Sequence, residues 1–157
     1  MIESDLQNNE TNIQSDSSIN ITSSRLIEKN ISDNWLTKEV AKQVDKNNVA
    51  NLTNSDFESI IEIDLSSQNL SGEIPNELYL LTNLKILKLS SNKLTGTLSS
   101  SIGNLINLEH LDISGNDLTG TIPSEIGLCT KLIWLDISRN EFSGEIPSSI
   151  EILLTML

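Results

Sequence analysis

Residues 111–123 have the sequence LDISGNDLTGTIP, and close variants of it occur three more times in the chain. The variants are IDLSSQNLSGEIP at 63–75, LKLSSNKLTGTLS at 87–99 and LDISRNEFSGEIP at 135–147, each 24 residues from the next without insertion or deletion. A unit of this length cannot bury a hydrophobic core alone, so consecutive units stack and share one. The sequence therefore predicts an α/β solenoid of four 24-residue repeats, at 60–83, 84–107, 108–131 and 132–155.

Apolar residues occupy the same seven places in every repeat, at offsets 0, 3, 5, 10, 14, 18 and 21 from its first residue. All 28 of these positions are apolar, which makes chance an implausible explanation. Offsets 3 and 5 alternate with polar neighbours, which is the period of a half-buried strand. We therefore expect four short parallel strands that point these pairs into the core: Ile63 and Leu65, Leu87 and Leu89, Leu111 and Ile113, Leu135 and Ile137.

Polar and turn-forming residues follow each predicted strand at fixed offsets. Offset 8 is Asn92, Asn116 or Asn140, with Gln68 in the first repeat, and we expect the amides to bond backbone groups of the bend and of the adjacent repeat. Offset 12 is always glycine, which permits a close backbone approach or a positive φ. Ile-Pro then favours an extended segment on the side of the repeat away from the predicted strand. Leu98-Ser99 replaces Ile-Pro in the second repeat.

The complete pattern, LxxLxLxxNxLxGxIPxxIGxLxx, resembles the plant-type leucine-rich repeat of receptor-like kinase ectodomains and polygalacturonase-inhibiting proteins. The resemblance covers residues 60–155. It implies a leucine-rich-repeat right-handed superhelix with a short parallel concave sheet, and a module that binds proteins or peptides. Caps of the family carry paired cysteines and a tryptophan at the N-terminus, whereas no cysteine precedes Cys129 in this chain.

The segments on either side of the repeats differ from them in composition. Residues 1–31 are rich in Asn and Ser and too poor in apolar residues to offset their ordering entropy, so we expect a disordered tail. Residues 32–59 predict a helical N-terminal cap, with Ser32 or Asp33 as N-cap, Trp35 packed inside, and an apolar stripe that ends near Asn47–Asn48 and comprises Leu36, Val40 and Val44. At the other end, EILLTML leaves an uncapped apolar rung. We therefore expect either a fragment or a truncated gene model of a longer protein, or an end that frays or self-associates.

Composition excludes several classes of function and favours a location. A net charge of −12 argues against binding to nucleic acid or to anionic membranes, and no stretch approaches the ~20 apolar residues of a membrane span. We expect no metal and no cofactor, and we expect Cys129, at a core offset, to be a buried hydrophobe. The N-terminus lacks the basic and apolar regions of a signal peptide, which favours the cytoplasm. An extracellular or cell-surface location is the alternative, if the start codon lies further upstream.

Offset 2 is the position where the repeat does not dictate the residue, and here it is Glu62, Ile86, His110 and Trp134. Apolar and aromatic side chains on an exposed sheet are typical of binding surfaces, and Arg139 on the rung of Trp134 adds a charged anchor.

Two catalytic interpretations of the same face are weaker than the binding interpretation. Offset 4 places Asp112 beside Asp136, which could imitate a carboxylate pair, but a solvated ladder with Asp64 and Lys88 is the favoured interpretation. Offset 6 is always serine, yet His110 lies roughly 13 Å from Ser114 at ~3.3 Å per strand residue, too far for a nucleophile–base pair.

The sequence therefore predicts a non-enzymatic protein- or peptide-binding module that uses the concave face. Its expected partner-binding residues are Ile86, His110, Trp134, Asp112, Asp136 and Arg139. The alternative is a fragment of a receptor-like kinase ectodomain or of a longer secreted or cell-surface repeat protein. A purely structural repeat protein, with no defined partner, is a third interpretation.

Overall fold

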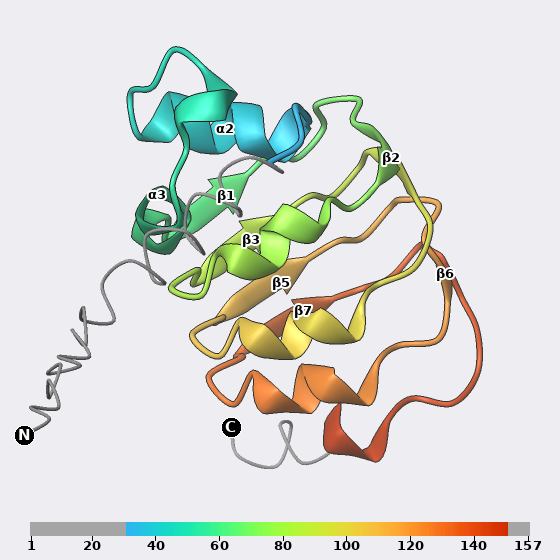
Figure 1. Cartoon of the computed structure of the whole chain (residues 1–157). Coiled ribbons are helices and arrows are strands. Elements are labelled where there is room, and N and C mark those ends of the chain that lie inside the picture. Colours follow the sequence, from blue (N-terminus) through green and yellow to red (C-terminus); the bar gives the residue numbers. More distant parts are fainter. Residues whose placement is uncertain (1–30, 151–157) are drawn as a thin grey trace, which may run out of the picture.

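Four parallel strands form the main sheet of the computed structural model, which describes residues 31–150 (Figure 1). The strands lie in the order β1 (Glu62–Asp64), β3 (Ile86–Lys88), β5 (His110–Asp112) and β7 (Trp134–Asp136). Each residue pairs with the residue 24 positions later, because every rung is one repeat. The predicted strands and their register are confirmed. The expected tail at 1–31, apart from Ile31, lies outside the described residues. So do residues 151–157, which contain the end of the fourth repeat and the expected uncapped rung.

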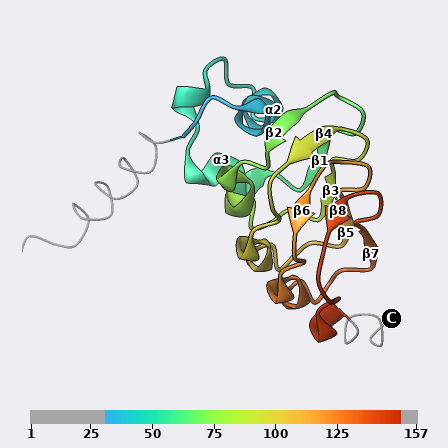
Figure 2. The same cartoon turned by 90° about the vertical axis from the view of Figure 1, so that its right-hand side faces the viewer.

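Each rung also contains a second strand, of two or three residues, that the repeat pattern does not predict. β2 (Ser71–Glu73) pairs with β4 (Lys93–Thr95), and β6 (Thr119–Gly120) pairs with β8 (Glu141–Phe142). The chain returns through 3-10 helices at η2 (Asn76–Leu80), η3 (Ser100–Asn104) and η4 (Ser124–Leu128), which Figure 2 shows on the side opposite the main sheet. The four glycines at offset 12 have φ between 78° and 84°, which confirms their predicted backbone role.

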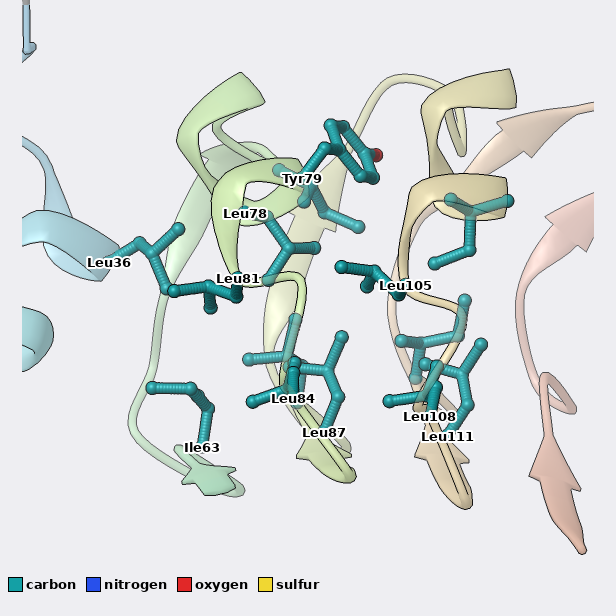
Figure 3. Packing of buried hydrophobic residues seen from close by; sticks show 14 of the residues in the cluster. Leu36, Ile63, Leu78, Tyr79, Leu81, Leu84, Leu87, Leu105, Leu108 and Leu111 are labelled. Carbon is teal, nitrogen blue, oxygen red and sulfur yellow. The ribbon is translucent and has the colours of Figure 1, made fainter. Parts of the chain in front are cut away.

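The core lies between the main sheet and the 3-10 helices. Leu87 and Leu111 from the strands lie across from Leu78, Leu81 and Leu105 on the helical side (Figure 3), and all five are buried. Burial of large aliphatic side chains at ~1.5–3 kcal/mol each is the main force that holds the rungs together.

Burial weakens at the last described rung. Leu135 and Ile137 are half-buried, and Ile146 is 67% exposed. Ile146, an apolar residue at offset 14, is exposed because β8 is the last strand of its sheet and no described rung covers it.

An asparagine ladder ties neighbouring rungs together, as predicted. The Asn92 Nδ2 donates to the carbonyls of Leu65 and Leu89, both at 2.9 Å. Its Oδ1 accepts from the backbone N–H groups of Gln68 at 3.0 Å and Leu70 at 2.9 Å. One side chain thus satisfies four backbone groups of two rungs that no strand ladder reaches.

The N-terminal cap contains α2 (Trp35–Gln43), η1 (Val49–Asn51) and α3 (Asn54–Ser59). The first helix differs from its prediction at both ends. Its N-cap is Asn34, not Ser32 or Asp33, because Asn34 and Thr37 form a reciprocal capping box. It ends before Asn47–Asn48, because Asp45 adopts a φ of 55° and the N–H of Lys46 donates to the Ala41 carbonyl at 2.8 Å.

Apolar side chains of the cap cover the first repeat. Leu36, Val40, Leu52 and Phe57 are fully buried, and Trp35 packs against the core while remaining partly exposed. The cap therefore buries the first rung without the cysteines that related caps carry. Between residues 31 and 150, no helix is long and apolar enough to cross a membrane.

Candidate binding face

The solvent side of the four-stranded sheet, called the concave face below, brings the predicted site residues together. The register pairs Ile86 with His110, His110 with Trp134, and Asp112 with Asp136. Neighbouring strands lie ~4.8 Å apart, and alternate residues of one strand lie ~6.6 Å apart. The four residues at the corners of a compact rectangle are therefore His110, Asp112, Trp134 and Asp136. Arg139 follows β7 in a bend with a φ of 52° and is exposed.

Exposure along the offset-2 row is uneven. Trp134 is 57% exposed, whereas Ile86 and His110 are half-buried. Ile86 and His110 are less exposed because each lies on a strand with a neighbour on both sides. Trp134 lies on β7, the last described strand of the sheet. The tryptophan is therefore the most accessible apolar group of the predicted site.

One further exposed apolar residue, adjacent in sequence to the predicted site, was not identified from the sequence. Ile133 precedes Trp134 and is 53% exposed. The signal was present, since offset 1 holds Lys85 and Glu109 in the two preceding repeats and an isoleucine in the fourth. Ile133 and Trp134 together make the start of β7 apolar.

Two ion pairs link the strands in the first half of the main sheet and its approach. Lys88 Nζ lies 3.5 Å from Asp64, and Lys85 Nζ lies 3.1 Å from Glu109. Lys88 therefore pairs with Asp64 on one side of the ladder. Asp112 makes no ion pair with any residue between 31 and 150 in this structure.

The aspartates behave as hydrogen-bonded surface carboxylates. Asp112 Oδ1 accepts from the N–H of Ser114 at 3.0 Å and from its hydroxyl at 2.7 Å. The side chain and the N–H of Ser138 hydrogen-bond Asp136 and, with help from the positive charge of Arg139, lower the pKa of Asp136. A carboxylate pair that shares a proton has one strongly raised pKa. The arrangement thus favours the solvated ladder over an acid–base pair.

The remaining nucleophiles are held in structural roles. The Ser114 hydroxyl donates to Asp112, and the Ser90 hydroxyl donates to Ser66 at 3.3 Å. Cys129 is fully buried, as predicted, and burial raises the pKa of its thiol to about 11. Within the described part of the chain, no three His, Cys, Asp or Glu side chains form a group that could hold a metal ion.

Comparison with known proteins agrees with the repeat geometry. Residues 82–142 match the family model of the leucine rich repeat. None of the curated proteins matches this chain. Among solved structures, the BIR3–SERK2 complex from Arabidopsis thaliana is similar, with 44% identity and a TM-score of 0.58. The similarity covers 60% of this chain and 50% of that one.

The solenoid is a plant-type leucine-rich-repeat domain. The Arabidopsis receptor kinase HAESA, in complex with the peptide hormone IDA and the co-receptor SERK1, matches with 41% identity and a TM-score of 0.59. A plant ice-binding protein matches with 37% identity and a TM-score of 0.55. These matches cover 62% and 60% of this chain but only 16% and 31% of the other chains. The leucine-rich-repeat chain thus spans half or less of the length of these proteins.

Proposed function

We propose that this leucine-rich-repeat domain is a non-enzymatic module that binds a protein or peptide through its concave face. The observation that carries the proposal is Trp134, a large apolar side chain that is 57% exposed on a rigid sheet. Tryptophan is enriched among residues that dominate binding energy, and its exposure to water is unfavourable. Structural neighbours support the proposal, because HAESA is complexed with a peptide hormone and PEPR1 with AtPEP1.

The sheet offers a preorganised surface. Each strand of the main sheet is hydrogen-bonded to its neighbours in register, so the side chains of the face are fixed by the backbone. A ligand that binds such a face does not have to order it, which lowers the entropic cost of association. Within the proposed site, Trp134 is the apolar anchor, Ile86 and His110 extend it along the row, and Asp112, Asp136 and Arg139 supply charge.

A second candidate is a piece of a receptor-like kinase ectodomain or of a longer secreted or cell-surface repeat protein. This candidate is favoured because the chain is similar to receptor-kinase ectodomains but covers only a small share of their length. In the PEPR1 structure the match covers 13% of the PEPR1 chain. Sequencing the transcript past the codon of Leu157 separates the two. An open reading frame that continues into more repeats supports the longer protein, and an in-frame stop codon at that point contradicts it.

The binding proposal is tested with a displayed library of random peptides selected on the immobilised full chain. Binders selected on the wild type should lose capture by Trp134→Ala and His110→Ala, while the circular dichroism of both variants stays unchanged. Ile106→Ala is the matched control, since Ile106 is 55% exposed but lies outside the main sheet. Undiminished capture by both site variants, or equal loss with the control, would show that the concave face is not the binding surface.

A further inference from the structure

The pairing of charges on the concave face leaves a local excess of negative charge beside Trp134. Lys85 and Lys88, the two lysines of the main sheet and its approach, are already engaged with Glu109 and Asp64. Arg139 is the cation left near Asp136, and it makes no ion pair with any residue between 31 and 150 in this structure. Asp112 lies opposite Lys88, whose ammonium pairs with Asp64, and Asp136 has the charge of Arg139 nearby, so neither carboxylate is engaged in an ion pair within residues 31–150.

The carboxylates of Asp112 and Asp136 present one free oxygen each. The register places the two residues opposite each other on β5 and β7, ~4.8 Å apart. In both, Oδ1 accepts from the serine two residues later, and Oδ2 has no hydrogen-bond partner among the described residues. The serines therefore fix the orientation of both carboxylates and leave two acceptors directed away from those bonds.

An aromatic face borders the same pair. Trp134 is two residues before Asp136 on β7, so both side chains lie on the same side of the sheet, ~6.6 Å apart. A cation within ~6 Å of an indole ring is attracted by its electron-rich face. Carboxylates and an exposed indole in one place are complementary to a group that is both positively charged and flat, which is the guanidinium of arginine.

We propose that the ligand of the concave face is an extended peptide with an arginine side chain that binds between Asp112 and Asp136 and against Trp134. The inference rests on the proposed function and adds to it the chemistry of the ligand. The two free oxygens accept from the guanidinium, and the indole covers one of its faces. An apolar residue of the same peptide then lies toward Ile86 and His110, the half-buried part of the row.

The test selects peptides from a displayed random library on three forms of the full chain: wild type, Asp112→Asn with Asp136→Asn, and Asp117→Asn. Asp117 is exposed and lies outside the main sheet, so it controls for loss of charge alone. Peptides selected on the wild type and on Asp117→Asn should share an arginine beside an apolar residue. The double variant should lose this enrichment.

A selected peptide is then compared with the same peptide carrying citrulline, the neutral analogue of arginine, in calorimetry. Citrulline should weaken binding to the wild type by about tenfold or more and should have little further effect on the double variant. Selected peptides without a basic residue, or equal affinity for the citrulline peptide, would overturn the arginine inference while leaving the binding function intact. If no peptide is enriched on the wild type, or if Trp134→Ala keeps full affinity, the proposed function fails and the inference fails with it.

Discussion

The side chain of Asn116 joins two rungs, because its Nδ2 donates to the Leu89 carbonyl of the preceding rung at 3.0 Å. The same nitrogen donates to Ile113 at 3.0 Å, and Oδ1 accepts from the N–H of Leu94 at 3.0 Å. Asn116 is one of two buried polar residues described, and it belongs to the middle of the ladder. The bends of these two rungs depend on the Asn116 amide for part of their hydrogen bonding.

Asn116→Ala should therefore destabilise the domain strongly. The substitution leaves the N–H of Leu94 without a partner and removes one of two amide donors from the carbonyls of Leu89 and Ile113. A buried unsatisfied donor costs ~1–3 kcal/mol. We expect a loss of about 1–3 kcal/mol in the free energy of unfolding, measured by urea denaturation. Asn104→Ala is the control, because Asn104 is exposed and should change stability by less than about 0.5 kcal/mol. Equal effects of the two substitutions would contradict the ladder as a source of stability.

Glycines at offset 12 should differ in their tolerance of alanine. Both Gly72 and Gly120 have positive φ, but a Cβ on Gly72 meets nothing within 4 Å, whereas one on Gly120 lies 2.9 Å from Thr97 Cγ2. Gly72→Ala should cost only the backbone strain of ~1–2 kcal/mol. Gly120→Ala should cost more, and Thr97→Ser, which removes the methyl group, should recover the difference. Thermal unfolding of the single and double variants measures this coupling, and its absence would show that strain alone limits the position.

Acid should weaken the N-terminal cap through Asp56. Burial raises the pKa of Asp56, but the hydrogen bonds from Lys46 at 2.6 Å and from the hydroxyl and N–H of Thr53 outweigh it and lower the pKa. A lowered pKa means that the carboxylate stabilises the fold above its unfolded pKa of ~4, and that this stability is lost as pH falls through the folded pKa.

Asp56→Asn should accordingly reduce stability by about 1–2 kcal/mol at pH 7 and by much less at pH ~2. Hydrogen exchange of residues 35–59 at the two pH values reports the cap directly. Asp33→Asn is the control. It removes an ion pair to Lys38 at the surface, where the side chains of Asp33 and Lys38 are 70% and 64% exposed, so it should change stability by less than about 0.5 kcal/mol. If Asp56→Asn lowers stability by the same amount at both pH values, the loss comes from packing rather than from the charge of Asp56.

Alkali should act on the core through Cys129. Its thiol has a pKa raised to about 11 by burial, so the neutral form stabilises the fold below the unfolded pKa and this contribution is lost as pH rises through about 11. Tyr79, whose pKa burial also raises, contributes in the same direction. Cys129→Ala should therefore flatten the loss of stability between pH ~9 and ~11 without abolishing it.

The same burial predicts slow reaction of the native thiol with a water-soluble maleimide, and fast reaction after addition of urea. A rate in native buffer equal to that of a free thiol would place Cys129 at the surface and contradict the packing of the third rung.

The repeat made the rungs predictable because every strand residue pairs with the equivalent residue 24 positions away. The N-cap of α2 lacked such a constraint, since Ser32, Asp33 and Asn34 all suit the position. The residue that selects Asn34 as N-cap is distant in sequence. The N–H of Ser32 and the Nδ2 of Asn34 donate to Glu77 at 3.0 and 3.3 Å. Contacts of this kind have no local signature in a sequence.

The irregular second repeat shows the same limit. Ser99 stands where the other repeats have proline, and its N–H donates to the hydroxyl of Tyr79 at 3.4 Å. Proline has no N–H, so the departure from the pattern and the buried tyrosine of the preceding rung belong together. At the candidate site, the sequence identified the row of Ile86, His110 and Trp134, but not its uneven exposure, because exposure depends on which strand ends the sheet.

The most direct test of binding at the concave face follows the two indole N–H resonances of the chain, from Trp35 and Trp134, by nuclear magnetic resonance. Trp134→Phe assigns the signals. Titration with a peptide selected on the wild type should shift the Trp134 signal and leave Trp35, which packs in the N-terminal cap, unchanged. A peptide that binds by calorimetry while the Trp134 signal stays in place, or while the Trp35 signal alone moves, would contradict binding at the concave face.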